Sequence, residues 1–131
     1  KAIVLSEGTD VTLVATGHLV WEALQAAKIL EEQGISAEVI DIHTIKPLDN
    51  EAILKSVAKT NCVVGCEEHQ FNGGLNESIA QLLVRNNPKP MEFVGVDDCF
   101  GESGTPDALM EKYGLKANNI VEAAKKVIAR K

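Results

Sequence analysis

Short apolar runs alternate along the chain with segments of helical periodicity. The runs rich in Val, Ile and Leu predict five strands, at residues 2–5, 11–15, 36–42, 62–66 and 91–96. Between them, apolar residues recur every three or four positions, which predicts amphipathic helices. The first of these helices follows Gly17 and ends at Gly34, with an apolar arc made of Val20, Ala23, Leu24, Ala27 and Leu30.

Capping residues mark where the later helices begin. Asp49 is a good N-cap for the second helix, and a glycine pair ending at Gly74 opens the third. A short helix is expected within residues 105–114. Asn119 with Glu122 predicts a capping box at the start of the last helix.

This alternation predicts the α/β class for one domain that spans residues 1–131. Strands connected by crossover helices form a parallel sheet covered on both faces. Only a few residues join the first strand to the second, which is too short for a parallel crossover. We therefore expect a three-layer α/β/α sandwich with a mostly parallel sheet of about five strands, the first strand being antiparallel.

Composition narrows the function classes. The formal net charge of -6 argues against a nucleic-acid partner, because phosphate contacts need clustered Lys and Arg. The chain has no apolar run near the roughly 20 residues that span a membrane, so a cytoplasmic protein is expected. Its 3 cysteines are an odd number, which favours free thiols over a disulfide framework. Cys62 and Cys66 share one face of a strand and are expected to be small buried hydrophobes.

Three strand-to-helix connections carry histidines. In the turn before the first helix, Gly17 allows a sharp bend, and His18 is placed to cap the helix or to meet an anionic ligand. A single glycine is not a dinucleotide fingerprint, so a tight turn is favoured. His43 and His69 follow other strands, and such connections meet at one edge of a parallel sheet.

The stretch Glu67-Glu68-His69 directly follows the fourth strand. Two outcomes are open: one carboxylate caps the helix that opens at Gly73-Gly74 or a neighbouring loop, or the whole stretch faces a partner. Neither this stretch nor Asp97-Asp98 offers the ligand arrangement of a metal site, so none is expected.

Trp21 lies on the polar side of its helix, together with Gln25, Lys28 and Glu32. A tryptophan in that place is either a contact for another protein or is covered by a loop of its own domain.

Read in order, the segments EGTDVTLVATG, EALQAAKILEEQGISAEVIDIHTIKPLD, SVAKTNCVVGCEEH, GGLNESIA and VDDCFGESGTPDALMEKYGL resemble the C-terminal domain of the transketolase family. The resemblance runs from residue 7 to about residue 127. FGESG followed by a helix ending in YGL is more similar to the transketolase branch than to the 2-oxo acid dehydrogenase branch.

The resemblance implies an enzyme that uses thiamine diphosphate and Mg²⁺, bound between a pyrophosphate-binding and a pyrimidine-binding domain at a dimer interface. The domain similar to this chain comes third, and the GDG…NN signature of the metal site is not in the sequence. No catalytic, cofactor-binding or metal-binding residue is therefore expected here, and the isolated domain is expected to be inactive. The candidate interface or anion contacts are Gly17, His18, Trp21, Glu67, Glu68 and His69.

The implied function is the C-terminal part of a split bacterial-type transketolase subunit in pentose phosphate metabolism. The intact enzyme would transfer a two-carbon ketol unit between sugar phosphates, with the cofactor-binding domains on the same chain or on a separate subunit. Two alternatives remain: the docking module of a 2-oxo acid dehydrogenase E1 β subunit, or part of a deoxyxylulose-phosphate synthase.

Overall fold

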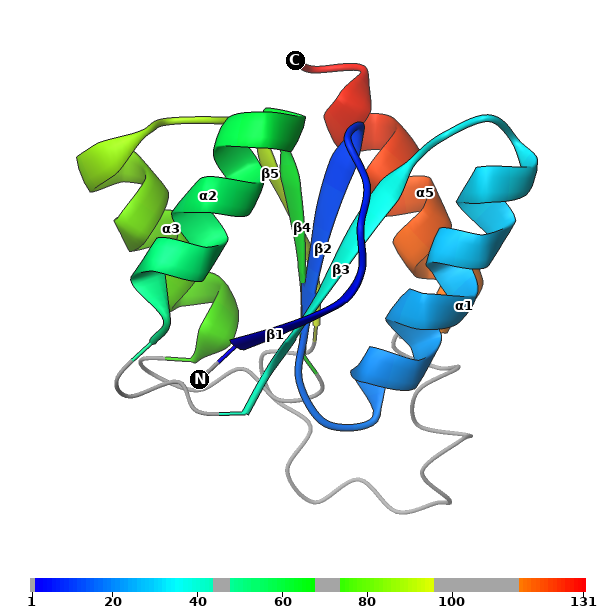
Figure 1. Cartoon of the computed structure of the whole chain (residues 1–131), viewed down its shortest axis with the longest axis horizontal. Helices are drawn as coiled ribbons and strands as arrows, with labels where there is room; N and C mark the ends of the chain where they lie inside the picture. The colour runs from blue at the N-terminus through cyan, green and yellow to red at the C-terminus, as the bar shows by residue number, and fades with distance from the viewer. Residues whose placement is uncertain (1, 44–47, 68–73, 96–115) are drawn as a thin grey trace.

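A five-stranded sheet forms the middle layer of the molecule (Figure 1). The computed structural model describes residues 2–43, 48–67, 74–95 and 116–131. The strand order is β1-β3-β2-β4-β5, in which β1 is antiparallel to β3 and the other neighbours are parallel. The strands are β1 (Ala2–Ser6), β2 (Val11–Ala15), β3 (Ala37–Ile42), β4 (Val63–Cys66) and β5 (Met91–Val94).

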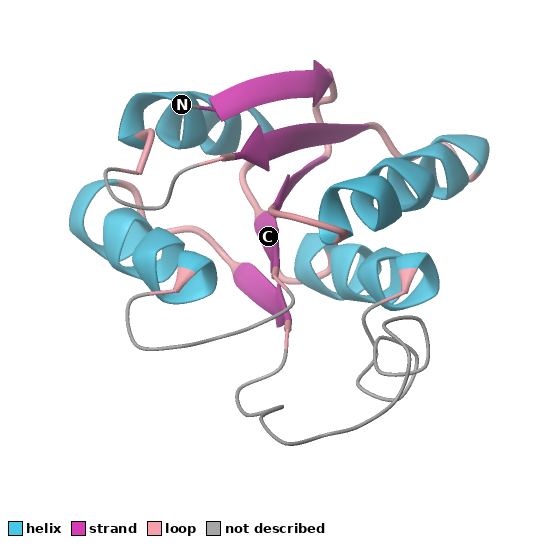
Figure 2. Ribbon diagram, turned by 90° about the horizontal axis from the view of Figure 1, so that it is seen from below, coloured by secondary structure: helices cyan, strands magenta, loops and turns pink. Residues whose placement is uncertain are grey.

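Described helices cover both faces of the sheet, as Figure 2 shows from below. Helices α1 (Leu19–Glu32) and α5 (Ala117–Ile128) pack on one face, and α2 (Asn50–Thr60) and α3 (Leu75–Asn86) on the other. Neighbouring residues of a strand point to opposite faces, so Leu13 packs under α1 while Val14 packs under α2 and α3. The expected three-layer sandwich is confirmed. Among the described helices, none combines the length and the apolar character needed to cross a membrane.

The boundaries of the described helices follow the expected signals with one exception, and the short helix expected within residues 105–114 lies outside the described residues. Asp49 caps α2 by accepting a hydrogen bond from the Ala52 amide (3.2 Å), and Gly34 adopts φ +80° after α1. The prediction of Asn119 as an N-cap is wrong, because α5 already begins at Ala117. Asn119 is the third helical residue, and its Oδ1 accepts from the Lys116 amide (3.2 Å).

The first strand is antiparallel as expected, but it pairs with β3 and not with the strand that follows it in sequence. The connection from β1 to β2 therefore crosses over the start of β3. A Cβ at Gly8 would lie 2.3 Å from the Ala37 carbonyl carbon, so only glycine fits at the crossing. The Asp10 amide donates to the Ser36 carbonyl (2.8 Å), which fixes the crossing against β3.

Buried polar side chains join this crossing to α2. Glu38 is 4% exposed, and one of its carboxylate oxygens accepts hydrogen bonds from the Gly8 amide (3.1 Å) and from Lys59 Nζ (2.5 Å). Burial would raise the pKa of Glu38, but hydrogen bonds from Lys59, Ser56 and Gly8 outweigh it and lower the pKa. The amino end of the sheet is therefore held by a satisfied polar network.

Candidate functional site at the carboxyl edge of the sheet

The carboxyl ends of β2, β3 and β4 meet at one edge of the sheet, where ligands bind in open α/β folds. Gly17 has φ +58°, a conformation that glycine adopts without strain, so the sharp turn expected from the sequence is confirmed. His18 occupies the N-cap position of α1, but its side chain makes no cap hydrogen bond. The expected capping of α1 by the His18 side chain is therefore not observed.

An open hollow of about 510 Å³ lies between this turn and the end of β3. It brings together His18 and His43, which the sequence placed at one edge. Asp41 lies beside them, with its Oδ2 3.6 Å from His43 Nε2. The hollow is lined by Gly17, His18, Val20, Trp21, Leu24, Asp41 and His43.

Trp21 borders the hollow and is 64% exposed. Of the two expectations for this side chain, a cover supplied by its own domain is not found among the described residues. A large apolar side chain left in water at the rim of a hollow is typical of a contact surface.

Glu67 has the capping role that the sequence left open. It follows β4 directly and is only 3% exposed. Its two carboxylate oxygens accept hydrogen bonds from the first amides of α3, those of Leu75 (3.0 Å) and Asn76 (2.8 Å). A negative charge at this place also interacts favourably with the helix dipole. Glu68 and His69 lie outside the described residues.

Asn76 lies behind this cap and explains the glycine in β4. The Asn76 side chain is fully buried, and its two polar atoms have no hydrogen-bond partner among the described residues. A Cβ at Gly65 would come within 1.9 Å of Asn76 Oδ1, so the amide fills the space that a side chain at residue 65 would need. The start of α3 thus packs directly on the backbone of β4.

Cys62 and Cys66 are free, buried and on the same face of the sheet, which confirms their expected role as small hydrophobes. Burial raises the pKa of the Cys66 thiol well above its ordinary value. Burial also raises the pKa of Cys62, although Lys131 opposes the shift. Neither thiol is suited to act as a nucleophile. Cys99 and the acidic pair Asp97-Asp98 lie outside the described residues.

The described residues do not fit a bound thiamine diphosphate with its metal ion. Within this part of the chain, no group of three or more His, Cys, Asp or Glu side chains is placed to hold a metal. The hollow also presents the Asp41 carboxylate, which would repel a diphosphate. We therefore assign no described residue to the cofactor.

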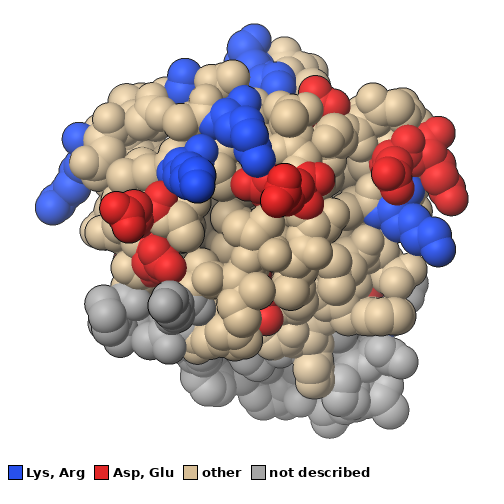
Figure 3. Space-filling view, in the orientation of Figure 1, with Lys and Arg blue, Asp and Glu red and all other residues tan. Residues whose placement is uncertain are grey.

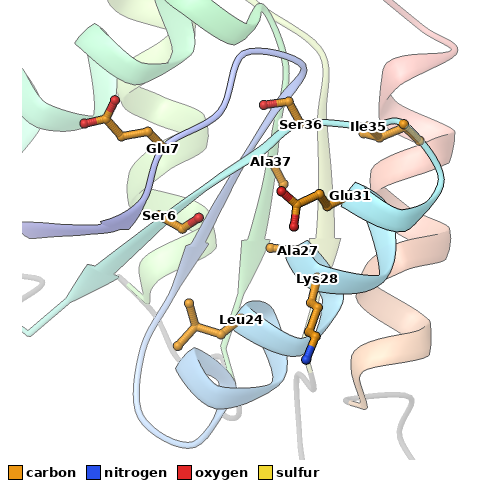
Figure 4. A pocket seen from close by; sticks show the side chains of 10 residues that line it. Ser6, Glu7, Leu24, Ala27, Lys28, Glu31, Ile35, Ser36 and Ala37 are labelled. Atoms are coloured by element: carbon orange, nitrogen blue, oxygen red, sulfur yellow. The ribbon is translucent and has the colours of Figure 1, made fainter.

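A second hollow of about 400 Å³ adjoins the first along α1 (Figure 4). Leu24 lines both hollows, while Lys28 and Glu31 line the second from the same helix. Ser6 and Ser36 border it from the end of β1 and the start of β3. The two hollows therefore both lie against α1 and have Leu24 in common.

Asp41 is the residue of this edge that the sequence reasoning missed. The segment Asp41-Ile42-His43 carried a signal for it, because residues two apart in an extended segment project to the same face. In contrast, the turn after β2 lies near the end of β3 because these two strands are neighbours in the sheet. The sequence alone does not give this strand order.

Comparisons with known proteins agree with this geometry. The family described as "Transketolase, C-terminal domain" matches residues 1–120. The chain is 53% identical to the 6-deoxy-6-sulfo-D-fructose transketolase subunit SqwH of Clostridium sp. (strain MSTE9), over all of this chain and 41% of that protein. It is 38% identical to an apulose-4-phosphate transketolase subunit of Phocaeicola vulgatus, over 95% of this chain and 39% of that protein.

Among solved structures, a split-gene transketolase described as an inactive β4 tetramer superposes with a TM-score of 0.92. The two chains are 47% identical, and the match covers 98% of this chain and 42% of the other. A 1-deoxy-D-xylulose-5-phosphate synthase of Desulforudis audaxviator is 37% identical, over 95% of this chain and 20% of that protein. The chain thus spans about two fifths of the split transketolase subunits and a fifth of the synthase.

Proposed function

Because the chain belongs to the family of transketolase C-terminal domains, we propose that it is the C-terminal domain of a split transketolase subunit. In this proposal the complete enzyme transfers a two-carbon ketol unit from a ketose to an aldose. The cofactor-binding domains are supplied by the rest of the subunit and by a partner subunit. Support comes from relatives that are themselves named as transketolase subunits and from the split-gene structure.

Transketolases and deoxyxylulose-phosphate synthases use thiamine diphosphate, which supplies the carbanion chemistry when it is bound. Our proposal gives this domain a structural role, in which it supports assembly and shapes one side of the approach to the reaction site. The observation that supports this structural role is the set of hydrogen bonds made by Glu67. This buried carboxylate lies at the functional edge of the sheet, but both of its oxygens are bonded to α3.

The proposed substrate is a ketose that carries an anionic group at the end opposite its ketol unit. This inference follows from the names of two relatives, one of which acts on a sulfonated fructose and the other on a sugar phosphate. A sulfonate and a phosphate present similar tetrahedral oxyanions. Pentose phosphates and a sulfonated ketohexose are therefore the donors to test first.

Reconstitution of the complete subunit with its partner subunit tests the proposal. We expect ketol transfer to an aldose phosphate only when both subunits and thiamine diphosphate with Mg²⁺ are present. The 131-residue chain alone should show no turnover. Robust turnover by that chain, or a reconstituted enzyme inactive with every ketose donor, would contradict the proposal.

The deoxyxylulose-phosphate synthase alternative is favoured by the 37% identity to that enzyme. The same reconstituted enzyme separates the two functions if it is also given a 2-oxo acid that loses CO2 to supply a CH3–CO– unit, because the synthase then forms 1-deoxy-D-xylulose 5-phosphate, which a ketol donor cannot yield. The remaining alternative, a docking module of an E1 β subunit, predicts instead a stable complex with an acyltransferase core. Both alternatives are rejected if ketol transfer is the activity found.

A further inference from the structure

The first strand delivers the amino terminus to the carboxyl edge of the sheet. Because β1 is antiparallel to β3, its first residue, Ala2, pairs with Ile42 at the end of β3. The Ala2 amide also donates to Asp49 Oδ2 (3.1 Å). Figure 1 shows the amino terminus and the turn before α1 in the lower part of the molecule, whereas the carboxyl terminus lies at the top. The backbone therefore enters the first strand at the candidate edge.

The edge presents apolar side chains to solvent beside this point. Ile3 is 47% exposed and pairs in register with Asp41, so both side chains are on the same face of the sheet. Asp41 lines the hollow beside Trp21, which is 64% exposed. We call this area the Trp21 surface, and define it by Ile3, Trp21, Leu24, Asp41 and His43.

Most charged side chains on the visible face lie away from this edge (Figure 3). In Figure 3 the Lys, Arg, Asp and Glu side chains of the visible face gather mostly in its upper half, away from this edge. The described part below them is largely uncharged. A surface with few charged side chains is typical of the centre of a protein interface, and Asp41 is the one carboxylate among the residues that define the Trp21 surface.

We propose that the Trp21 surface is covered by the preceding domain of the same polypeptide, with Trp21 as the central anchor of the contact. The split transketolase relatives are more than twice as long as this chain, which is similar to their C-terminal domain. Their preceding part is therefore joined at β1, next to Ile3. Attachment at this edge raises the local concentration of that domain at the surface, which favours it over a second copy or a partner subunit.

The inference rests on the proposed function only in taking the chain as the C-terminal part of a longer subunit.

Site-specific photocrosslinking in the complete subunit tests whether the preceding domain covers the Trp21 surface. Trp21 is replaced by p-benzoylphenylalanine, and Val84 is replaced in the same way as a matched control. Val84 is 73% exposed on α3, which packs on the opposite face of the sheet. Equal amounts of light and ¹⁵N-labelled subunit are mixed, assembled with the partner subunit and then irradiated.

Position 21 should crosslink to residues upstream of this domain, in pairs that are all light or all heavy, at least fivefold more than position 84. Pairs of mixed isotope would assign the surface to a second copy, and crosslinks to the partner subunit would assign it to that subunit. Either result, or equal yields at the two positions, would overturn the proposal. Ketol transfer is measured on the same preparation before irradiation. An inactive assembly with intrachain crosslinks would remove the proposed function but keep the inference.

Discussion

At the scale of single residues, the Glu67 carboxylate satisfies two amides that no carbonyl within α3 can reach. Replacement of Glu67 by Ala leaves both amides buried without their acceptor. We expect this change to lower the free energy of unfolding by about 1–3 kcal/mol. Glu67→Gln should cost less, because one amide oxygen remains to accept. Urea unfolding followed by circular dichroism gives both values.

Glu122→Ala is the matched control, because this glutamate is exposed on α5. It should change stability by less than about 0.5 kcal/mol. Equal stability of Glu67→Ala and Glu122→Ala would show that the cap does not stabilise α3.

At the scale of elements, the crossing of the β1–β2 connection over β3 depends on the missing side chain of Gly8. A Cβ there would overlap backbone atoms of Ala37, which cannot move without breaking the sheet. Gly8→Ala should therefore lower the free energy of unfolding by about 3 kcal/mol, the upper end of what overpacking typically costs.

Gly34→Ala separates this packing effect from backbone strain. Gly34 has φ +80°, but nothing lies within 4 Å of its added Cβ. Its replacement should cost only about 1–2 kcal/mol. Urea denaturation of both variants measures the difference, and a smaller loss for Gly8→Ala than for Gly34→Ala would exclude a tight crossing.

The Glu38 network links β3 to α2 and predicts a pH dependence. The pKa of Glu38 is lowered from 4.5, so its ionised form stabilises the fold above that pH. This stability is lost as the pH falls below 4.5 through the lowered value. Glu38→Gln should reduce the free energy of unfolding by about 1–2 kcal/mol at pH 7.

The difference between wild type and Glu38→Gln should shrink on acidification, because protonation of the native carboxylate removes the same interaction. Unfolding free energies between pH 7 and pH 3 measure it. A constant difference over this range would mean that Glu38 does not titrate with folding.

These elements also show how far sequence reasoning reaches. Apolar periodicity predicted the described strands and helices, because each one buries a face that repeats locally in the chain. The pairing of β1 with β3 was not predictable in this way, since it depends on a contact between Gly8 and Ala37, far apart in sequence. The start of α5 was misplaced for a similar reason: Glu22 of α1 accepts a hydrogen bond from the Ala117 amide (2.9 Å).

Some features of the candidate site were likewise predictable from local sequence, and others depended on the strand order. The turn at Gly17 and the possibility of a capping carboxylate followed from local sequence, and the structure shows both. The meeting of His18 with Asp41 and His43 required the order of β2 and β3 in the sheet. Buried polar groups such as Glu38 gave no local signal, because their partners come from other elements.

At the scale of the whole molecule, the exposure of Trp21 should depend on whether the rest of the subunit is present. Trp21 is the only tryptophan of the chain, and its fluorescence reports on its surroundings. In the folded 131-residue chain, acrylamide should quench this emission readily because the side chain is 64% exposed. In the complete subunit, with any other tryptophan replaced by Phe, the preceding domain should shield it and lower the quenching constant at least twofold.

A Trp21→Phe, Val84→Trp variant provides the control, since residue 84 faces solvent in the domain and should be quenched equally in both forms. If Trp21 is quenched equally in the chain and in the complete subunit, the Trp21 surface remains open to solvent and the domain is held by other contacts.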